Sequence, residues 1–287
     1  MMLEEHSVLV QGITGREGSF HTRQMLDYGT RVAAGVTPGK GGLSIEGVPV
    51  YDTVRHAIRE QPGIGFSVVF VPPEHSFDAI LESIDAEIPW IVAITEGIPI
   101  KDTLWLVNYA TLKGSHILGP NCPGIIVPGK YKVGIMPSNA FTKGKIGLIS
   151  RSGTLTYEVA NAIKAEGLGV SAAFGAGGDA IVGTSMLEIA RMFESDPGTD
   201  SMVVLGEVGG AMEETLASAM HAGIITKPVV AYIAGLTAPP GKRMGHAGAI
   251  MSAGSGSPKI KLEKLKDAGA TITSSPLQIP KILLAMQ

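Results

Sequence analysis

His246 lies in a glycine-rich segment of the chain, Gly241-Lys242-Arg243-Met244-Gly245-His246-Ala247-Gly248-Ala249. Small neighbours leave a histidine open to large, charged reactants, and the two cations that precede it suit a phosphate group. A neutral imidazole acts as a nucleophile when its other nitrogen is held by a hydrogen-bonding partner. The segment therefore predicts a histidine that carries a phosphoryl group, although it also fits an ordinary loop histidine.

Glu207 is the candidate partner for that imidazole. It follows the apolar run Met202–Leu205 and precedes two glycines, so its carboxylate should be partly buried at the end of a strand and should need a partner. A carboxylate bonded to one ring nitrogen fixes the tautomer and leaves the other nitrogen as the nucleophile. We expect Glu207 to bond His246; a bond to backbone N–H groups is the alternative.

A candidate phosphate site lies near the start of the second half of the chain. Ser152 is a good helix N-cap, and Gly153 and Thr154 would leave free N–H groups in the first helical turn. Such a terminus attracts an anion through its unpaired donors and its dipole. Structural capping alone would also explain Ser152.

A second phosphate cradle is predicted after the first strand. Gly12, Gly15 and Gly18 come close to the dinucleotide-binding fingerprint without matching it, because the first two glycines of that fingerprint are two residues apart. The second strand runs into Gly35–Gly42, which carries Lys40 where an enzyme preferring NAD would offer an acidic residue. A lysine there suits a phosphomonoester, as in NADP or in the 3′-phosphate of coenzyme A (CoA), or else it is a solvated loop residue.

Several other catalytic motifs are missing from the sequence. Gly35–Lys40 is too short for a P-loop, and Gly235–Lys242 is one residue too long and is followed by Arg243 rather than serine or threonine. No histidine–cysteine cluster has zinc spacing, and no Gly-x-Ser-x-Gly elbow occurs. We therefore expect neither metal ligands nor an ATP site in this chain.

The elements that must position these residues alternate along the chain, with helical periodicity between short apolar runs, and this pattern predicts parallel sheets wound by helices. Strands are expected at residues 7–11, 31–36, 64–71, 90–95, 116–118, 146–150, 170–174, 202–205, 229–233 and 271–273. Helices are expected at residues 19–28, 53–60, 76–86, 101–113, 154–165, 185–195, 212–222 and 258–268. We predict two doubly wound α/β domains, residues 1–125 and 145–287, joined by a connection over 126–144. Ligands of such sheets bind at the carboxyl ends of the strands.

Composition excludes several classes of protein. Hydrophobic residues make up 45% and charged residues 17% of the 287 residues, as in a compact α/β protein rather than a disordered chain. The formal net charge is −3 and no basic run occurs, which argues against a nucleic-acid partner. The single cysteine, Cys122, fits a reducing compartment. No apolar stretch of about 18 residues and no basic N-terminal signal region occurs, so we expect a cytoplasmic protein without a membrane partner, or a mitochondrial-matrix protein if a transit peptide has been removed.

Taken together, these residues resemble, essentially end to end, the α subunits of succinyl-CoA synthetase (succinate–CoA ligase, ADP- or GDP-forming), the acid–thiol ligase of the citric acid cycle. The most specific segments are Gln11–Gly15, Gly35–Gly42, Gly119–Gly124, Ser150–Glu158, Gly206–Gly210 and Gly245–Ala249.

The resemblance implies a Rossmann-like CoA-binding domain followed by a flavodoxin-like, doubly wound ligase domain. His246 would be the phosphorylated residue, supported by Glu207 and by the helix that starts at Ser152-Gly153-Thr154, and Tyr157 would lie near the acyl substrate. By the motifs of the family, CoA would be contacted by Thr14, Gly15, Arg16, Glu17, Lys40, Ile94, Thr95 and Glu96.

The implied reaction is a phosphoryl relay. ATP or GTP with Mg²⁺ would phosphorylate His246, the phosphoryl group would pass to succinate as an acyl phosphate, and CoA would displace phosphate. The nucleotide would be bound mainly by a partner, a β subunit with an ATP-grasp domain, in an αβ heterodimer or an α2β2 heterotetramer.

Two segments depart from the family pattern. Ala180 stands where the family usually has proline, and residues Met251–Pro258 differ from the usual Gly-Lys-Gly-Thr stretch. Because the departures leave acyl specificity open, a ligase for malate or another dicarboxylate is the nearest alternative. An NADP-binding oxidoreductase would explain Lys40 but not His246, and a CoA-binding protein without chemistry would leave His246 inert.

Overall fold

The computed structural model describes residues 6–251 and 256–286. The acidic N-terminal residues 1–5 lie outside this range, and so do residues 252–255 of the segment that departs from the family pattern. The described residues form two compact units. The first comprises residues 6–126, 130–136 and 181–183, and the second comprises the remainder.

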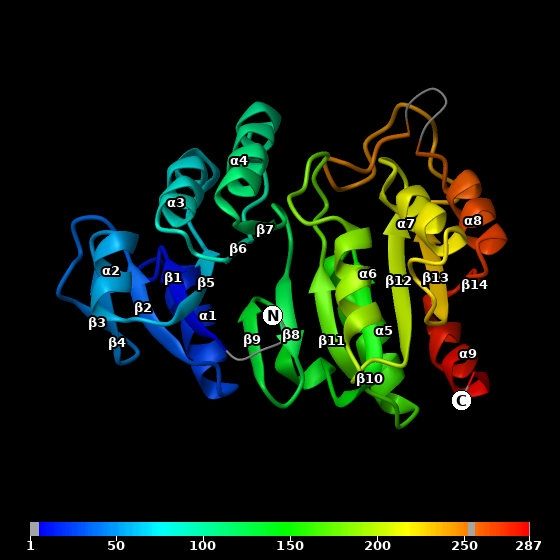
Figure 1. Ribbon diagram of the computed structural model, residues 1–287, viewed down its shortest axis with the longest axis horizontal. Helices are drawn as coiled ribbons and strands as arrows, with labels where there is room; N and C mark the ends of the chain where they lie inside the picture. Colours follow the sequence, from blue (N-terminus) through cyan, green and yellow to red (C-terminus); the bar gives the residue numbers. More distant parts are fainter. Residues whose placement is uncertain (1–5, 252–255, 287) are drawn as a thin grey trace. The chain divides into compact units, whose positions relative to one another are not determined.

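The first unit has a Rossmann-like sheet (Figure 1). Its strand order is β3-β4-β2-β1-β5-β6-β7, and these neighbours pair in parallel except for the antiparallel β3–β4 hairpin. Without β3 this is the order of the dinucleotide-binding folds, which reverses between β1 and β5. The elements of this part of the chain are β1 (Ser7–Gln11), α1 (Arg16–Asp27), β2 (Val32–Val36), β3 (Ser44–Ile45), β4 (Val48–Tyr51), α2 (Val54–Glu60), β5 (Ile64–Val69), α3 (Pro73–Asp85), β6 (Trp90–Ala93), α4 (Ile100–Lys113), β7 (His116–Leu118), β8 (Gly124–Val127) and β9 (Tyr131–Gly134).

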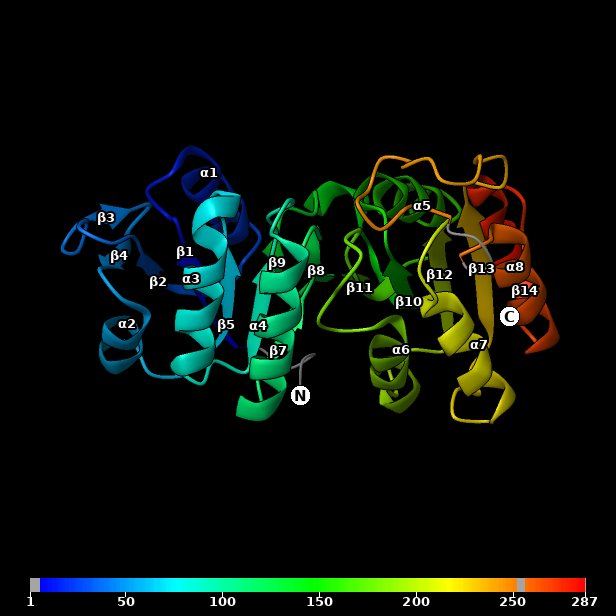
Figure 2. The same cartoon turned by 90° about the horizontal axis from the view of Figure 1, so that it is seen from above.

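Helices cover both faces of this sheet. Helix α1 lies on one face, whereas α2, α3 and α4 lie on the other (Figure 2). The connections from β1 to β2 and from β5 to β6 run in opposite directions, and right-handed crossovers then place their helices on opposite faces. Ile80 and Ile84 of α3 and Leu106 of α4 pack with Ile91 of β6 in a fully buried cluster. The central strands read as continuous apolar runs because both faces are covered.

The turn between β1 and α1 depends on two glycines. Gly12 has a φ of +76°, a region that glycine adopts without steric cost. A Cβ atom at Gly18 would lie 2.1 Å from the carbonyl oxygen of Gly12, so the helix packs directly on the turn. Helix α1 consequently begins at Arg16, earlier than the predicted residue 19, and Glu17 lies in its first turn.

The second unit has the flavodoxin-like strand order β14-β13-β12-β10-β11. These neighbours all pair in parallel. Helices α6, α7 and α8 pack consecutively on one face, and α5 packs with α9 on the other. The elements are η1 (Ser138–Ala140), β10 (Lys143–Ser150), α5 (Gly153–Ala165), β11 (Val170–Gly175), α6 (Met186–Ser195), β12 (Ser201–Glu207), α7 (Met212–His221), β13 (Val229–Ala234), α8 (Pro258–Asp267), β14 (Thr271–Ile272), η2 (Pro276–Gln278) and α9 (Ile279–Ala285).

The fold class predicted from the sequence is confirmed, with a Rossmann-like part followed by a flavodoxin-like part. The elements that the sequence analysis did not assign are short: the β3–β4 hairpin, the β8–β9 hairpin, helix α9 and the 3-10 turns η1 and η2. The passage 119–144, which the sequence analysis left without strands, contains β8, β9 and the 3-10 turn η1. Strands of two to four residues are too short to show a period of two, and the seven residues of α9 span only about two helical turns, so neither shows a clear period.

Within the described ranges, no helix combines the length and the apolar character needed to span a membrane.

Candidate functional site

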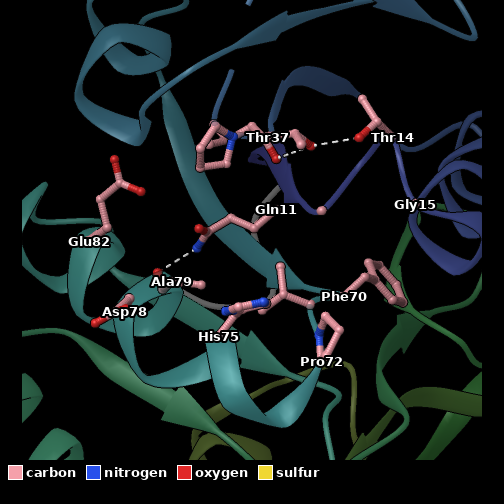
Figure 3. Close-up of a pocket in the computed structure, with 14 residues that line it drawn as sticks. Gln11, Thr14, Gly15, Thr37, Phe70, Pro72, His75, Asp78, Ala79 and Glu82 are labelled. Carbon is pink, nitrogen blue, oxygen red and sulfur yellow. Dashed lines mark hydrogen bonds between the residues drawn. The ribbon is translucent and has the colours of Figure 1, made fainter. Parts of the chain in front are cut away.

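The first unit contains a cavity of about 520 Å³ at the point where its strand order reverses. The loops after β1, β2 and β5 and one side of α3 form its walls (Figure 3). Such a crevice is the usual ligand site of an open α/β sheet. Its lining residues are Gln11, Gly12, Thr14, Gly15, Val36, Thr37, Pro38, Phe70, Val71, Pro72, His75, Asp78, Ala79 and Glu82.

The polar groups of this cavity are held by the protein itself. The side-chain amide of Gln11 donates to the carbonyl oxygen of Ala79 at 2.6 Å, and the hydroxyl of Thr14 donates to that of Thr37 at 3.1 Å (Figure 3). Burial raises the pKa of Glu82, although its carboxylate accepts a hydrogen bond from the N–H of Val54. The cavity is therefore mostly apolar with a few oriented polar groups, as in nucleotide and cofactor sites.

A second cavity of about 360 Å³ shares Phe70, Val71 and Pro72 with the first. Glu17, His21, Ile94, Thr95 and Ile135 complete its lining. The ring of His21 stacks on that of Phe70, with centroids 5.4 Å apart and planes 9° apart. Burial and the positive charge of Lys132 lower the pKa of His21, so this imidazole is neutral near pH 7. The two adjoining cavities form one elongated site along the carboxyl ends of the strands.

Lys132 of β9 is 2% exposed, and its ammonium group donates to the carbonyl oxygen of Met136 at 2.9 Å. Burial lowers its pKa from 10.5 to about 8. A lysine pKa that is lower in the folded state than in the unfolded state means that folding releases protons between those two values. The buried charge therefore costs stability below pH 8, and that cost disappears as the pH rises from 8 to 10.5.

We expect a Lys132→Met variant to lack this pH dependence. The free energy of unfolding of the wild type minus that of the variant should increase by about 3 kcal/mol between pH 8 and pH 10.5. Denaturant titrations at a series of pH values would measure it, with the exposed Lys130→Met variant as the control. A wild-type-minus-variant difference that stays constant across this window would contradict the assignment.

The structure brings together some of the residues predicted to contact CoA. Thr14 and Gly15 line the first cavity, and Glu17, Ile94 and Thr95 line the second. Among the described residues, Arg16, Lys40 and Glu96 are exposed and line neither cavity. Lys40 lies in the loop that follows β2, next to the lining residues Thr37 and Pro38, so it is near the rim.

The sequence analysis missed several other lining residues. Phe70 and His75 carried no motif, and neither did Asp78 and Glu82 of α3. Their only sequence signal is that they follow β5, the strand next to β1. Phe70 comes directly after that strand, and the other three lie on α3, the helix that follows it.

In the second unit, Glu207 and His246 come together. Glu207 is the last residue of β12, and its Oε2 lies 2.8 Å from Nδ1 of His246. Glu207 is 6% exposed, whereas the imidazole is 29% exposed. An ionised carboxylate only accepts hydrogen bonds, so a neutral ring that bonds it through Nδ1 has its proton there and its lone pair on Nε2. The expected contact between these two side chains is thus present in the structure.

Glycine backbone surrounds this pair closely. A Cβ atom at Gly178 would lie 2.5 Å from Cγ of His246, and one at Gly209 would lie 2.2 Å from the carbonyl oxygen of Gly248. The N–H of Gly248 donates to the carbonyl oxygen of Gly178 at 2.9 Å. The loops that follow β11 and β12 thus pack directly against the histidine segment and restrict where the ring can lie.

The predicted phosphate site is the start of α5, directly after β10. Ser152 is the N-cap, and its hydroxyl accepts from the N–H of Leu155 at 3.4 Å. Strand β10 pairs with β12, the strand that ends at Glu207. Tyr157 lies in the second turn of the same helix, with its ring against Phe141.

Buried charged residues that the sequence analysis did not identify lie behind Glu207. Arg151, Glu213 and Lys261 are each at most 2% exposed. Arg151 follows β10, while the other two lie on α7 and α8. From the sequence alone, each of them would be predicted to lie on the surface, because only the folded chain brings them together.

Comparison with known proteins decides the family. A model of the CoA-binding domain matches residues 3–97, and a model of the CoA-ligase family matches residues 149–271. The α subunit of ADP-forming succinate–CoA ligase from Aquifex aeolicus is 51% identical over 278 residues, which cover 96% of this chain and 90% of that one. An α subunit of the same enzyme from Archaeoglobus fulgidus is 50% identical, with 98% and 96% covered. The chain belongs to the succinate–CoA ligase α-subunit family.

This membership confirms the resemblance drawn from the sequence motifs. The chain is an α subunit of an enzyme, an acid–thiol ligase, and its first unit is a CoA-binding domain. The ligase interpretation is thereby favoured over an NADP-binding oxidoreductase and over a CoA-binding protein without chemistry. The matches concern whole chains and domains, so the roles of single residues in this α subunit are argued from its own geometry.

Solved structures share the fold of this α subunit. ATP citrate lyase from Methanothrix soehngenii, in complex with citrate and coenzyme A, superposes with a TM-score of 0.88 at 23% identity. The comparison covers 98% of this chain and 50% of that chain, so the α subunit spans half of the lyase chain. A dinucleotide-forming acetyl-coenzyme A synthetase from Ca. Korarchaeum cryptofilum superposes with a TM-score of 0.76 at 22% identity, covering 96% of this chain and 59% of the synthetase. At these identities the likeness concerns the fold.

No group of three or more histidine, cysteine, aspartate or glutamate side chains within the described part of this α subunit could hold a metal ion.

Proposed function

We propose that this chain forms succinyl-CoA from succinate and CoA at the expense of a nucleoside triphosphate, and catalyses the reverse reaction, through a phosphohistidine at His246. The observation that carries the proposal is the 2.8 Å contact between Nδ1 of His246 and the buried carboxylate of Glu207. A carboxylate so placed orients the ring and stabilises the positive charge that develops on it during attack.

The proposed relay has three steps. Nε2 of His246 attacks the γ-phosphorus and the nucleoside diphosphate leaves. A carboxylate oxygen of succinate then takes the phosphoryl group from Nε2 and becomes succinyl phosphate. The CoA thiolate finally attacks the acyl carbon and expels inorganic phosphate. This chain would accelerate each step by positioning the reacting groups and by stabilising the charge that develops on them.

Each residue predicted from the sequence has a place in this proposal. The N–H groups of Ser152, Gly153 and Thr154 stabilise the phosphoryl group through the dipole of α5. Tyr157, in the second turn of that helix, contacts the acyl substrate. The adjoining cavities of the first unit hold CoA, with its contacts predicted at Thr14, Gly15, Arg16, Glu17, Lys40, Ile94, Thr95 and Glu96.

The nucleotide and the partner are also part of the proposal. The chain lacks a P-loop, and the relatives are named as α subunits of an ADP-forming ligase. We infer a β subunit with an ATP-grasp domain that binds ATP, or GTP, with Mg²⁺. Phosphorylation of His246 then requires the assembled αβ or α2β2 complex.

The test is turnover by this chain co-purified with a β subunit from the same genome. Succinyl-CoA formation should depend on succinate, CoA, Mg²⁺ and a nucleoside triphosphate together, with ATP and GTP compared at equal concentration. Malate replaces succinate in a parallel assay. Faster turnover of malate would overturn the substrate assignment, and turnover without any phosphorylated intermediate would overturn the mechanism.

Lys40 should recognise the 3′-phosphate of CoA. Replacing the exposed Lys40 by methionine removes one charge-assisted contact, so the Kd for CoA should rise by roughly tenfold. Isothermal titration of wild type and variant with CoA and with 3′-dephospho-CoA would measure this at a fixed ionic strength. The wild type should prefer CoA and the variant should not.

Lys113→Met is the matched control for Lys40→Met, because Lys113 is also exposed and belongs to the same unit. If Lys40→Met kept the wild-type preference for CoA over its dephospho form, the assignment of Lys40 to the 3′-phosphate would be wrong.

A further inference from the structure

A cluster of buried charges lies beside Glu207. Arg151 is 2% exposed, and Glu213 and Lys261 are fully buried. Fully buried arginine, lysine and glutamate are rare in proteins, because removing a charge from water is costly unless close partners compensate it. We refer to these three residues as the Arg151–Glu213–Lys261 cluster.

Arg151 connects the cluster to the reacting pair. Its Nη2 lies 3.1 Å from Oε1 of Glu207, while Nδ1 of His246 lies 2.8 Å from Oε2 of the same carboxylate. One oxygen of Glu207 thus faces the guanidinium group and the other faces the imidazole. The contact with Arg151 is an ion pair without a hydrogen bond, whereas the contact with His246 is a hydrogen bond.

Glu213 and Lys261 hold Arg151 and the backbone around it. Oε1 of Glu213 lies 3.6 Å from Nη1 of Arg151 and also accepts a hydrogen bond from the N–H of Glu207 at 3.1 Å. The ammonium group of Lys261 donates to Oε2 of Glu213. The carboxylate of Glu213 therefore connects helices α7 and α8 to Glu207, the last residue of β12.

The carbonyl oxygen of Gly209 accepts hydrogen bonds from both cations of the cluster. Nη1 of Arg151 donates to it at 2.8 Å, and Nζ of Lys261 donates to it at 2.6 Å. Gly209 also packs directly against the backbone of Gly248, two residues after His246. The two hydrogen bonds therefore hold the peptide group on which the histidine segment packs. The cluster thus contacts the surroundings of the ring at two points, the carboxylate of Glu207 and the peptide group of Gly209.

The arrangement contains charges of both signs. Arg151 and Lys261 are positive, and Glu207 and Glu213 are negative. The carboxylate of Glu214 also lies 3.8 Å from Nζ of Lys261, so the five groups sum to −1 when His246 is neutral. A buried ion pair is seldom a better stabiliser than apolar side chains of the same volume, so stability alone does not account for four charges placed here. Their arrangement around one carboxylate indicates an orienting role.

We propose that Arg151, Glu213 and Lys261 are positioning residues for the reactive histidine. They hold Glu207 so that Oε2 accepts from Nδ1, and they thereby keep His246 in the Nδ1–H tautomer with the lone pair on Nε2. The inference rests on the proposed function, because that lone pair is the proposed nucleophile. Two of the three residues, Glu213 and Lys261, reach the ring only through Glu207, Arg151 or Gly209.

The test is the tautomer of His246 in the full chain, measured by ¹⁵N NMR of histidine-labelled protein. The wild type should show the Nδ1–H tautomer, and His246→Ala identifies the signals. In Glu213→Gln the second tautomer should become appreciably populated, although Glu207 and His246 are both intact. Arg151→Lys keeps the charge but cannot reach Glu207 and Gly209 together, so it should give the same result.

Destabilised variants do not prevent the test. The double variant Glu213→Gln/Lys261→Met removes one buried charge of each sign, and neutral replacement of a buried pair is tolerated better than loss of one partner. It too should shift the tautomer. Arg191→Gln, which removes an exposed arginine of the same unit, is the control and should not.

The kinetic readout uses the complex with the β subunit. The rate of His246 phosphorylation should fall by about 10- to 100-fold in Glu213→Gln, the scale seen for residues that orient metal-binding histidines from behind. Unchanged tautomer and rate in variants that are merely less stable would show that the cluster is structural and would overturn the inference. A wild type with the Nδ1–H tautomer that is never phosphorylated would instead overturn the proposed function.

Discussion

Replacing His246 by alanine should abolish phosphoryl transfer while leaving CoA binding unchanged. Removal of a covalent nucleophile lowers turnover by about 10⁶-fold in a well-studied hydrolase, and a similar loss is expected here because the phosphoryl group reaches succinate only through Nε2. The CoA cavities belong to a different unit of the chain, so the Kd for CoA should stay within twofold of the wild-type value.

The measurements for His246→Ala are steady-state turnover in the αβ complex and isothermal titration with CoA. His221→Ala is the matched control, because His221 is an exposed histidine near the end of α7 in the same unit. His246→Ala turning over at a tenth of the wild-type rate would show that the phosphoryl group takes another route.

Glu207→Gln should have the second largest effect. The amide has the shape of the carboxylate but carries no charge, and it can turn its NH₂ group toward Nδ1 and favour the wrong tautomer. The corresponding substitution in a serine protease triad lowers kcat by about 10⁴-fold. We expect a loss on the order of 10³- to 10⁴-fold in the rate of His246 phosphorylation.

Single-turnover phosphorylation of the αβ complex would measure the Glu207→Gln effect, since it separates chemistry from product release. Glu263→Gln serves as the control, because Glu263 is an exposed glutamate on α8. A loss of less than tenfold, in a variant that remains folded, would mean that the carboxylate only fills space beside the ring.

The contact between Glu207 and His246 could be predicted from the sequence because each residue carries a local signal. Glu207 ends an apolar run, so it had to be a buried carboxylate in need of a partner. His246 lies among glycines that admit close backbone packing, and the structure shows that packing at Gly178. Such signals survive in a single sequence because they depend on the type of one residue and its immediate neighbours.

The supporting cluster could not be predicted in the same way. Glu213 and Lys261 lie on two helices far apart in the sequence, and charged residues on helices usually face water. Their burial follows from the packing of α7 against α8, which depends on the whole sheet order. The β8–β9 hairpin was missed for a related reason, because its strands are four residues each and show no clear period.

The start of α1 was predicted at residue 19, three residues after its true start at Arg16, because it too depends on a tertiary contact. Its N-cap, Gly15, makes no side-chain capping hydrogen bond, so the usual serine, threonine or aspartate signal is missing. The helix begins there because Gly18 packs on the carbonyl group of Gly12. Residue types alone do not predict a contact between a helix and the preceding turn. They show only the glycines that permit such a contact.

The most direct test of the central claim is to label the αβ complex with γ-³²P-labelled ATP and Mg²⁺ and to locate the label in this chain. We predict one acid-labile, alkali-stable phosphoryl group on His246, and its discharge with formation of succinyl-CoA when succinate and CoA are added. A complex that makes succinyl-CoA without labelling His246, or whose label is not discharged by succinate and CoA, would contradict the account.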